Sequence, residues 1–480
     1  MMGLIRIVSS LRTLFTALSL CLVTASLWTY STVPAYFTNG QPKVVGPLVD
    51  LTKILTDIPD GHEGAAWTEG DAGPFQVIGR PVSRIAFDDS GIIDIRTGAN
   101  LDDANEGSTF NLAVLKLPQG SQWNFLGVAR GPTRMRDFMK INGWPSREQV
   151  LVAMGLNITS EGHLVPVTKG QTLDFPMIPR QGCEASGAWV ATYGAEDPRL
   201  FWTDAGTPSL TYARAALDNA KCRSVGFVRD MRSIFPELNG ALKTGVEGVT
   251  EYDGLREPGE GIDRELNRIV KQGVVEKNWM PFYPGALPDG ETIFPHIHYM
   301  VKSALSLQPI ETTPSRVKYA DVDLSTTDTK ECIGQAHSKS FKIHQATPLY
   351  RLTLCERGCI VTEQNTVNIA LSHTQSPTRQ YGRFLATFNV SYPFNPISVG
   401  PRFRLNGCDD VNDINYALTL APVQRSDLDS STSTVKVPQI VQPDHFFLDD
   451  HVLITMGHND KEMTTVLATV KEMLGRQQMC

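Results

Sequence analysis

One short segment concentrates residue types that can transfer a proton. In Glu196-Asp197-Pro198-Arg199, a carboxylate precedes a proline and stands two residues before an arginine. Proline restricts the residue before it to extended conformations. We therefore expect Asp197 to lie on a rigid, extended segment, oriented by an ion pair between Glu196 and Arg199. A carboxylate held in this way is suited to general acid or base catalysis. The alternative is a structural Asp-Pro turn with a surface ion pair, because such turns are common.

A second segment places charged and amide groups beside aromatic rings. It comprises Glu276, Lys277, Asn278 and Trp279, followed by Met-Pro-Phe. Aromatic faces stack on sugar rings, while Lys and Asn side chains donate hydrogen bonds to hydroxyl or phosphate oxygens. The segment therefore predicts a carbohydrate site. The alternative is a loop that an aromatic side chain anchors in the core.

Smaller signals are scattered along the chain. Five polar or charged residues stand close to apolar runs: Asn111, Arg130, His373, Tyr381 and Asp460. The structural alternative for Asp460 is the N-cap of a following helix. His296 and His298 alternate, so both would point to one face of a strand. Because no third ligand stands at a suitable spacing, we predict no metal site there.

The elements that must position these residues read as β-strands. Short apolar runs separated by turn residues recur from residue 81 onwards: 84–87, 92–95, 110–117, 123–130, 200–202, 209–213, 384–390 and 451–456. This pattern predicts an all-β sandwich, barrel or propeller. A propeller accommodates a domain as long as 81–480, because it adds sheets around an axis without enlarging any single core.

Helical periodicity is scarce. Residues 461–474 carry their apolar side chains on one side, which predicts a C-terminal amphipathic helix. The Pro/Ser/Thr-rich stretch 307–330 and the segment 423–437 are expected to form surface loops.

Composition narrows the classes of protein to be considered. Of the 480 residues, 41% are hydrophobic and 20% are charged, and the net charge is −7. These values are typical of a globular protein. They argue against general disorder and against a basic nucleic-acid-binding domain, which would show clustered Lys and Arg. We therefore expect no nucleic-acid partner.

The N-terminal region carries one membrane signal. Residues 14–30 have no charge, and Arg6 and Arg12 precede them. A span needs about 20 mostly apolar residues, and flanking basic residues face the cytoplasm. We expect a cytoplasmic tail (1–13), a transmembrane signal anchor (14–32), a stem (33–80) and a luminal domain (81–480). The chain would be a single-pass type II membrane protein of the Golgi or secretory pathway. The alternative is a cleaved secretory signal.

Two further features fit export. Asn157 and Asn389 begin glycosylation sequons. Seven cysteines follow the expected anchor, and in an oxidising lumen some of them should pair. The spacing of Cys355 and Cys359 would let a disulfide close a tight hairpin.

Taken in order, these motifs resemble those of a known family. The series is Phe110-Asn111, Arg130, Glu196-Asp197-Pro198-Arg199, Glu276-Lys277-Asn278-Trp279, His373, Tyr381 and Gly457 to Asp460. It resembles the β-mannoside phosphorylase and hydrolase family of five-bladed propellers. It is more similar still to that family's relatives, the fungal β-1,2-mannosyltransferases. The resemblance covers roughly 84–475, and the E-D-P-R and E-K-N-W segments are its specific parts.

The resemblance implies a five-bladed β-propeller with its site in the central depression. Asp197 would be the catalytic carboxylate. The implied sugar-binding residues are Asn111, Lys277 and Asp460. Those that would face phosphate or a diphosphate are Arg130, Arg199 and His373. Tyr381 would line the same pocket, and the remaining substrate-binding positions are Glu196, Glu276, Asn278 and Trp279.

The N-terminal anchor and long loops such as 307–345 depart from the phosphorylases. They favour a secretory-pathway transferase and leave the phosphate role of His373 in question. The function expected is an inverting β-1,2-mannosyltransferase of cell-wall glycan or glycolipid. It would use GDP-mannose as donor, a mannan-type acceptor and no cofactor. Two alternatives stay open: a phosphorylase or hydrolase on the same fold, and a non-catalytic glycan-binding propeller.

Overall fold

The structure is a computed structural model, and it describes most of the chain from residue 68 onwards. The described residues are 68–70, 73–88, 91–94, 109–141, 144–175, 192–215, 223–252, 264–268, 279–283, 295–300, 305–312, 316–323, 332–337, 342–375, 381–391, 394–405, 415–429, 441–459, 462–475 and 477–480. All of them belong to a unit that begins at Asp50. The expected tail and anchor lie outside the described residues. Among the helices that the structure does describe, none has the length and apolar character to cross a membrane.

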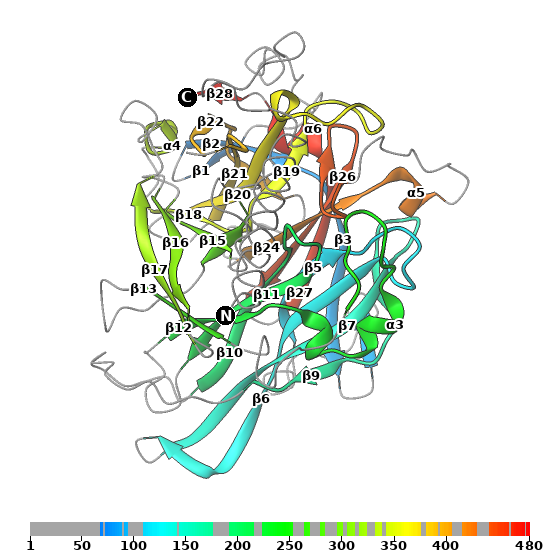
Figure 1. Ribbon diagram of the computed structural model, residues 1–480, viewed down its shortest axis with the longest axis vertical. Helices are drawn as coiled ribbons and strands as arrows, with labels where there is room; N and C mark the ends of the chain where they lie inside the picture. The colour runs from blue at the N-terminus through cyan, green and yellow to red at the C-terminus, as the bar shows by residue number, and fades with distance from the viewer. Residues whose placement is uncertain are drawn as a thin grey trace, which may run out of the picture. The chain divides into compact units, whose positions relative to one another are not determined.

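The described strands form three sheets, and Figure 1 shows how they are arranged. Pairing that is mainly antiparallel divides the strands into five groups, and three of these groups lie in one extended sheet. The first group is β5 (Phe110–Lys116), β6 (Phe125–Ile141), β7 (Trp144–Ile158), β8 (Leu164–Pro166) and β9 (Gln171–Leu173). The second is β10 (Thr192–Trp202), β11 (Pro208–Ala215), β12 (Arg223–Val228) and β13 (Arg264–Arg268). The third is β14 (Met280–Phe282), β15 (His296–Met300), β16 (Leu305–Thr312) and β17 (Arg316–Asp323). Parallel pairing of β7 with β10, and of β13 with β17, joins the three groups.

The fourth group forms a second sheet around β20. Its strands are β18 (Lys342–Gln345), β19 (Tyr350–Thr353), β20 (Thr366–Gln375), β21 (Tyr381–Phe388), β22 (Pro396–Val399) and β23 (Phe403–Leu405). Four short strands extend it: β1 (Thr68–Gly70), β2 (Gly73–Ile78), β25 (Phe446–Phe447) and β28 (Gln478–Met479). Because β2 pairs with β23, the end of the expected stem is part of the folded sheet.

The fifth group joins distant parts of the chain. It comprises β24 (Asn415–Val423), β26 (His451–His458), β27 (Glu462–Thr469), β3 (Arg80–Asp88) and β4 (Gly91–Asp94). β27 pairs antiparallel with β3, so an early strand closes onto a late one.

The described helices are all short: η3 (Met231–Ser233), α3 (Glu237–Ala241), α4 (Cys332–Ala336), η4 (Glu363–Asn365), α5 (Arg425–Leu428) and α6 (Val470–Leu474). The all-β expectation is therefore confirmed for the described residues, and the apolar runs quoted above fall on strands.

The helix expected over 461–474 is wrong in its first part. β27 occupies most of that segment, and only α6 is helical. Met463 to Ala468 are all buried, because β26 and β3 flank this strand. A helix with one apolar face would not suit a segment buried throughout, so tertiary pairing overrides local periodicity. The helix starts where Thr469 and Glu472 form a capping box.

The loop expected over 307–330 is also wrong in large part, since β16 and β17 occupy 305–312 and 316–323. Pro309, which suggested a loop, lies where the pairing of the two strands shifts register. Proline is tolerated at such irregularities because the ladder needs no N–H donor there. Of the segment 423–437, 425–428 form α5.

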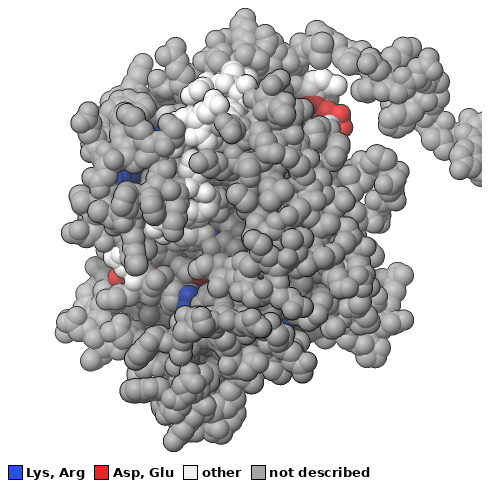
Figure 2. All heavy atoms as spheres, turned by 90° about the vertical axis from the view of Figure 1, so that its left-hand side faces the viewer, with Lys and Arg blue, Asp and Glu red and all other residues white. Residues whose placement is uncertain are grey.

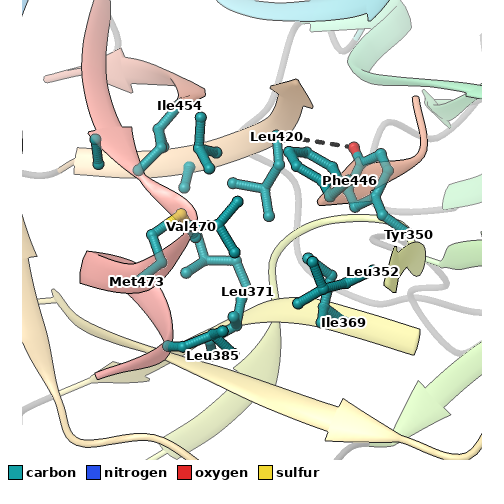
Figure 3. Packing of buried hydrophobic residues seen from close by; sticks show 14 of the residues in the cluster. Tyr350, Leu352, Ile369, Leu371, Leu385, Leu420, Phe446, Ile454, Val470 and Met473 are labelled. Carbon is teal, nitrogen blue, oxygen red and sulfur yellow. Dashed lines mark hydrogen bonds between the residues drawn. The ribbon is translucent and has the colours of Figure 1, made fainter. Parts of the chain in front are cut away.

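Buried apolar side chains from several elements pack beneath the strands. Figure 3 shows the largest part of one such cluster, to which β19, β20, β24, β26 and α6 all contribute. Within it, the backbone N–H of Leu420 donates to the Tyr350 hydroxyl at 3.3 Å. This contact fixes the centre of β24 against the start of β19.

Two disulfides are present among the described cysteines. Cys355 and Cys359 are bonded, which confirms the expected staple. Cys332 bonds Cys480 and ties α4 to the C-terminal residue. Cys183, Cys222 and Cys408 lie outside the described residues.

The described charges are dispersed on the face that Figure 2 shows. Lys and Arg, and Asp and Glu, appear there as isolated blue and red spots.

Candidate active site around Asp197

Asp197 lies in a β-bulge. The pairing of β10 with β11 shifts register between Glu196 and Arg199, and Asp197 has φ +48°. The expectation of an extended Asp197 is therefore wrong. A bulge sets an additional residue against its partner strand and bends the chain locally. Asp197 lies at this bulge in the left-handed conformation, which Asp tolerates better than most side chains.

A second bulge faces the first. Asn111 has φ +55°, and the pairing of β5 with β6 shifts register between Phe110 and Ala113. Asn111 is buried, and its Nδ2 donates to Asp197 Oδ1 at 2.8 Å. Two strained residues, 86 positions apart in the chain, thus meet through their side chains. Left-handed non-glycine residues are costly and cluster at functional sites.

Gly457 on β26 leaves the space that the Asn111 side chain occupies. A Cβ built on Gly457 would lie within bonding distance of Asn111 Oδ1, so the amide occupies the space that any side chain would need. Glycine is required here for close approach of a neighbouring group. The sequence motif that begins at Gly457 therefore acts in the site through backbone shape.

We expect Gly457→Ala to damage the site by displacing Asn111. The added methyl group forces the buried amide away from Asp197, which should lower activity at least tenfold. Overpacking of this kind costs about 1–3 kcal/mol of unfolding free energy. Thermal unfolding and a transfer assay measure the two effects.

Two variants make this test specific. Gly240→Ala is the matched control, because a Cβ there meets nothing within 4 Å. In the double variant Gly457→Ala/Asn111→Ala, the side chain with which the new methyl group clashes is absent. The losses of stability caused by the two single substitutions should therefore be strongly non-additive. Additive losses would show that Gly457 does not act through Asn111.

Arg130 and Glu196 flank the carboxylate. Arg130 Nη2 lies 3.3 Å from Glu196 Oε1, and Arg130 Nη1 lies 3.8 Å from Asp197 Oδ1. The guanidinium also stacks on the Phe110 ring, with Cζ 4.7 Å from the ring centre. Arg130 thus takes the ion-pairing position beside Glu196 that we expected of Arg199. Its side chain keeps 19% of its surface exposed, and that of Asp197 keeps 14%. Both groups are therefore accessible to a ligand.

Arg199 is buried beneath Asp197. Its guanidinium donates to the carbonyls of Pro198 at 2.8 Å and Ala346 at 3.2 Å. It also lies over the Tyr416 ring, with Cζ 5.5 Å from the ring centre. Its Nη2 atom has no hydrogen-bond acceptor among the described residues.

Tyr416 extends the site towards β20. Burial, the largest cause, raises the pKa of its phenol to about 12, with Arg199 opposing that rise and Asp197 adding to it. The group therefore stays neutral and is available as a hydrogen-bond donor. No sequence motif pointed to Tyr416. Its position one residue after the start of β24 becomes informative only once β24 lies beside β26.

His373 and Tyr381 lie behind Tyr416. The ring centres of both are within 6.2 Å of the Tyr416 ring centre. The backbone N–H of Ala417 donates to His373 Nε2 at 3.3 Å, so the neutral ring carries its proton on Nδ1 and donates to His344 Nε2 at 3.4 Å. Burial and neighbouring cations hold the pKa of His373 well below its usual value. As a buried neutral ring, His373 supports the aromatic cluster and presents no positive charge.

The second sequence segment is only partly described. Trp279 is 2% exposed and packs in an apolar cluster with Phe201 and Phe227. This matches the alternative of an aromatic anchor. Glu276, Lys277, Asn278 and Asp460 lie outside the described residues. The structure thus brings Asn111, Arg130, Glu196, Asp197 and Arg199 together, with His373 and Tyr381 reached through Tyr416.

Comparisons with known proteins find weakly similar folds among solved structures, including the three below. No protein-family model matches the chain, and no curated protein matches it. A β-1,2-mannobiose phosphorylase from Listeria innocua, solved with β-1,2-mannobiose, is 10% identical, with a TM-score of 0.35 over 77% of this chain and 91% of that one. A mannose phosphorylase from Leishmania mexicana, solved with phosphate, is 9% identical, with a TM-score of 0.28 over 78% and 88%. An α-L-arabinofuranosidase from Podospora anserina, solved with cellotriose, is 8% identical, with a TM-score of 0.28 over 82% and 98%.

Proposed function

We propose that this chain is an inverting β-1,2-mannosyltransferase that transfers mannose from GDP-mannose to a mannoside acceptor. The observation that carries the proposal is the contact between Asn111 and Asp197. Arg130 lies 3.8 Å from the same carboxylate, and Arg199 donates to the backbone carbonyl of Asp197. These four residues come from three motifs of the family that the sequence resembles, because Asp197 and Arg199 share the E-D-P-R segment. Their meeting in space is what a shared catalytic site requires.

The strand pairing supports a five-bladed propeller. Five antiparallel groups follow one another along the chain, and β3 closes onto β27. A ring of sheets needs such a junction between its first and last parts. In such a propeller, β5, β10 and β24 would be inner strands and would carry Asn111, Asp197 and Tyr416 towards the central depression.

In the proposed reaction, inversion at the anomeric carbon proceeds in a single displacement. Asp197 would accept the proton of the attacking acceptor hydroxyl, directly or through a neighbouring sugar hydroxyl. Asn111 fixes the rotamer of that carboxylate by donating to Oδ1. The guanidinium groups of Arg130 and Arg199 would stabilise the charge on the departing diphosphate.

The proposed location is the secretory pathway, with 14–32 as membrane anchor and the β domain luminal. Both described disulfides support an oxidising compartment. Asn389 is exposed, as a glycosylated asparagine must be.

A transfer assay tests the proposal. Purified full-length chain is incubated with GDP-mannose and a mannan acceptor, and the linkage of the product is determined. We expect release of GDP and a new β-1,2 linkage. Cleavage of β-mannosides in phosphate or water, without use of the nucleotide, would favour a phosphorylase or hydrolase. That alternative is supported by the same two arginines, which suit inorganic phosphate equally well. Binding of glycans without turnover would favour a lectin.

A further inference from the structure

A cavity lies away from Asp197. It has a volume of about 540 Å³, and Trp202 from the end of β10 and Asn368 from the start of β20 both line it. On the same two strands, Asp197 lies five residues from Trp202, and His373 lies five residues from Asn368. Five strand residues span roughly 17 Å. Between the two places, the Tyr350 hydroxyl accepts from Leu420 within the packed core. The cavity is therefore separate from the site around Asp197.

The cavity has aromatic walls drawn from three elements. They are Trp202, Tyr283 and Tyr350, with Phe201 and Phe282 beside them. Trp202 is held in place because its Nε1 donates to the Lys116 carbonyl at 3.0 Å. Flat aromatic faces of this kind pack against the C–H faces of pyranose rings.

Polar groups of a different kind complete the lining. Asp444, Gln442 and Asn368 offer acceptors and amide donors within the cavity. Asp204 and Arg351 stand at its rim, 3.9 Å apart and each more than two-fifths exposed. Burial is the main cause that raises the pKa of Asp444 to about 7. Hydroxyl donors from a ligand would compensate for that burial.

The charges on the lining exclude an anionic ligand. Arg351 is the sole cation of the described lining and faces Asp204. Burial lowers the pKa of His445 to about 3, so that ring is neutral at physiological pH. Arg351 is paired with Asp204, so the described lining offers no unpaired positive charge that would attract phosphate groups. A wholly apolar ligand would cover the polar lining groups Asn368, Gln442 and Asp444 without offering them hydrogen bonds.

We propose that this cavity is a second, non-catalytic binding site for a neutral saccharide of one or two rings. Its volume falls within the range of about 300–1,000 Å³ that small-ligand sites occupy. The site goes beyond the transfer reaction and needs none of the residues around Asp197. It would hold a glycan at a distance from the reacting centre.

Calorimetric titration of the purified full-length chain with mannobiose tests the proposal. We expect two equivalents to bind. Tyr283→Ala removes a wall and Asp444→Asn removes an acceptor charge, and each should weaken one of the two equivalents by about tenfold or more. Asp174→Asn is the matched control, because this exposed carboxylate is not part of the lining, and it should leave both equivalents intact. Thermal unfolding of each variant verifies that it folds.

The outcomes separate this proposal from the transferase proposal. If mannobiose binding is unchanged in both folded cavity variants, the second site does not exist. Binding of spermidine or inorganic phosphate at the cavity in place of the sugar would also overturn it. A single equivalent that is lost in Tyr283→Ala and kept in Asp197→Asn would support the cavity and count against the site at Asp197.

Discussion

Replacing Asp197 with asparagine should lower the rate of mannosyl transfer by about 10²–10⁴-fold, the usual contribution of a general base. The side chain keeps its size, and its remaining carbonyl oxygen can still accept from Asn111 Nδ2, which now lies 2.8 Å from Asp197 Oδ1. Arg130 keeps its contact with Glu196. We therefore expect the variant to fold and to bind acceptor glycan with little change, so that the loss appears in kcat. Initial rates of GDP release measure it.

Asp174→Asn serves as the control for loss of one carboxylate at an exposed position, and it should transfer at the wild-type rate. If Asp197 acted as a nucleophile and not as a base, a covalent mannosyl-enzyme would form and the anomeric configuration would be retained. Transfer by Asp197→Asn at more than a tenth of the wild-type rate would remove Asp197 from the mechanism.

Acidification should destabilise the fold steeply below pH 6. Burial lowers the pKa of His296, His298 and His337 to about 4 and that of His445 to about 3. Burial also lowers the pKa of His373. Between pH 6.5 and 4 the unfolded chain therefore binds protons on these rings that the folded chain does not bind. The free energy of unfolding must fall as the pH falls through that window.

Two aspartates act in the opposite direction. Burial raises the pKa of Asp444 to about 7 and that of Asp450 to about 6. Their contribution to stability is present at low pH and is lost as the pH rises through those values. The four histidines with a pKa of about 3 to 4, set against the two aspartates, leave the unfolded state with about two more bound protons near pH 5, a slope of about 3 kcal/mol per pH unit. His373 adds to this slope, and Glu247, whose pKa burial raises, subtracts from it. Urea unfolding at pH 7.5, 6 and 5 measures this slope.

His298→Gln tests the assignment, because glutamine does not titrate and can still bond Gln345. The slope should fall by about 1.4 kcal/mol per pH unit in this variant. Phe388→Leu is the control: it packs on the His298 ring at 4.9 Å and should lower stability equally at every pH. A free energy of unfolding that is flat between pH 7.5 and 5 would contradict the prediction.

The sequence predicted which residues belong to the candidate site, but not how these residues are arranged. The residue types of the E-D-P-R segment pointed to Asp197, and the order of the weaker motifs added Asn111 and Arg130. The predicted conformation of Asp197 was wrong. The preference of a residue before proline for extended backbone describes an isolated chain, whereas the bulge is set by pairing with β11. Trp279 illustrates the same limit, since an aromatic ring can stack on a sugar or fill a core, and its 2% exposure places it in the core.

By itself the sequence determined the β character of the chain, because alternating apolar runs and turn residues act over a few neighbouring positions. It also indicated that Cys355 and Cys359 could pair, since four positions keep two cysteines within reach, and the structure shows that disulfide. Only the tertiary structure decided that Asn111 meets Asp197, that Gly457 leaves room for the amide, and that Tyr416 joins them. Those contacts depend on strand register and on two bulges, which hydrogen bonding between distant segments fixes and local sequence does not encode.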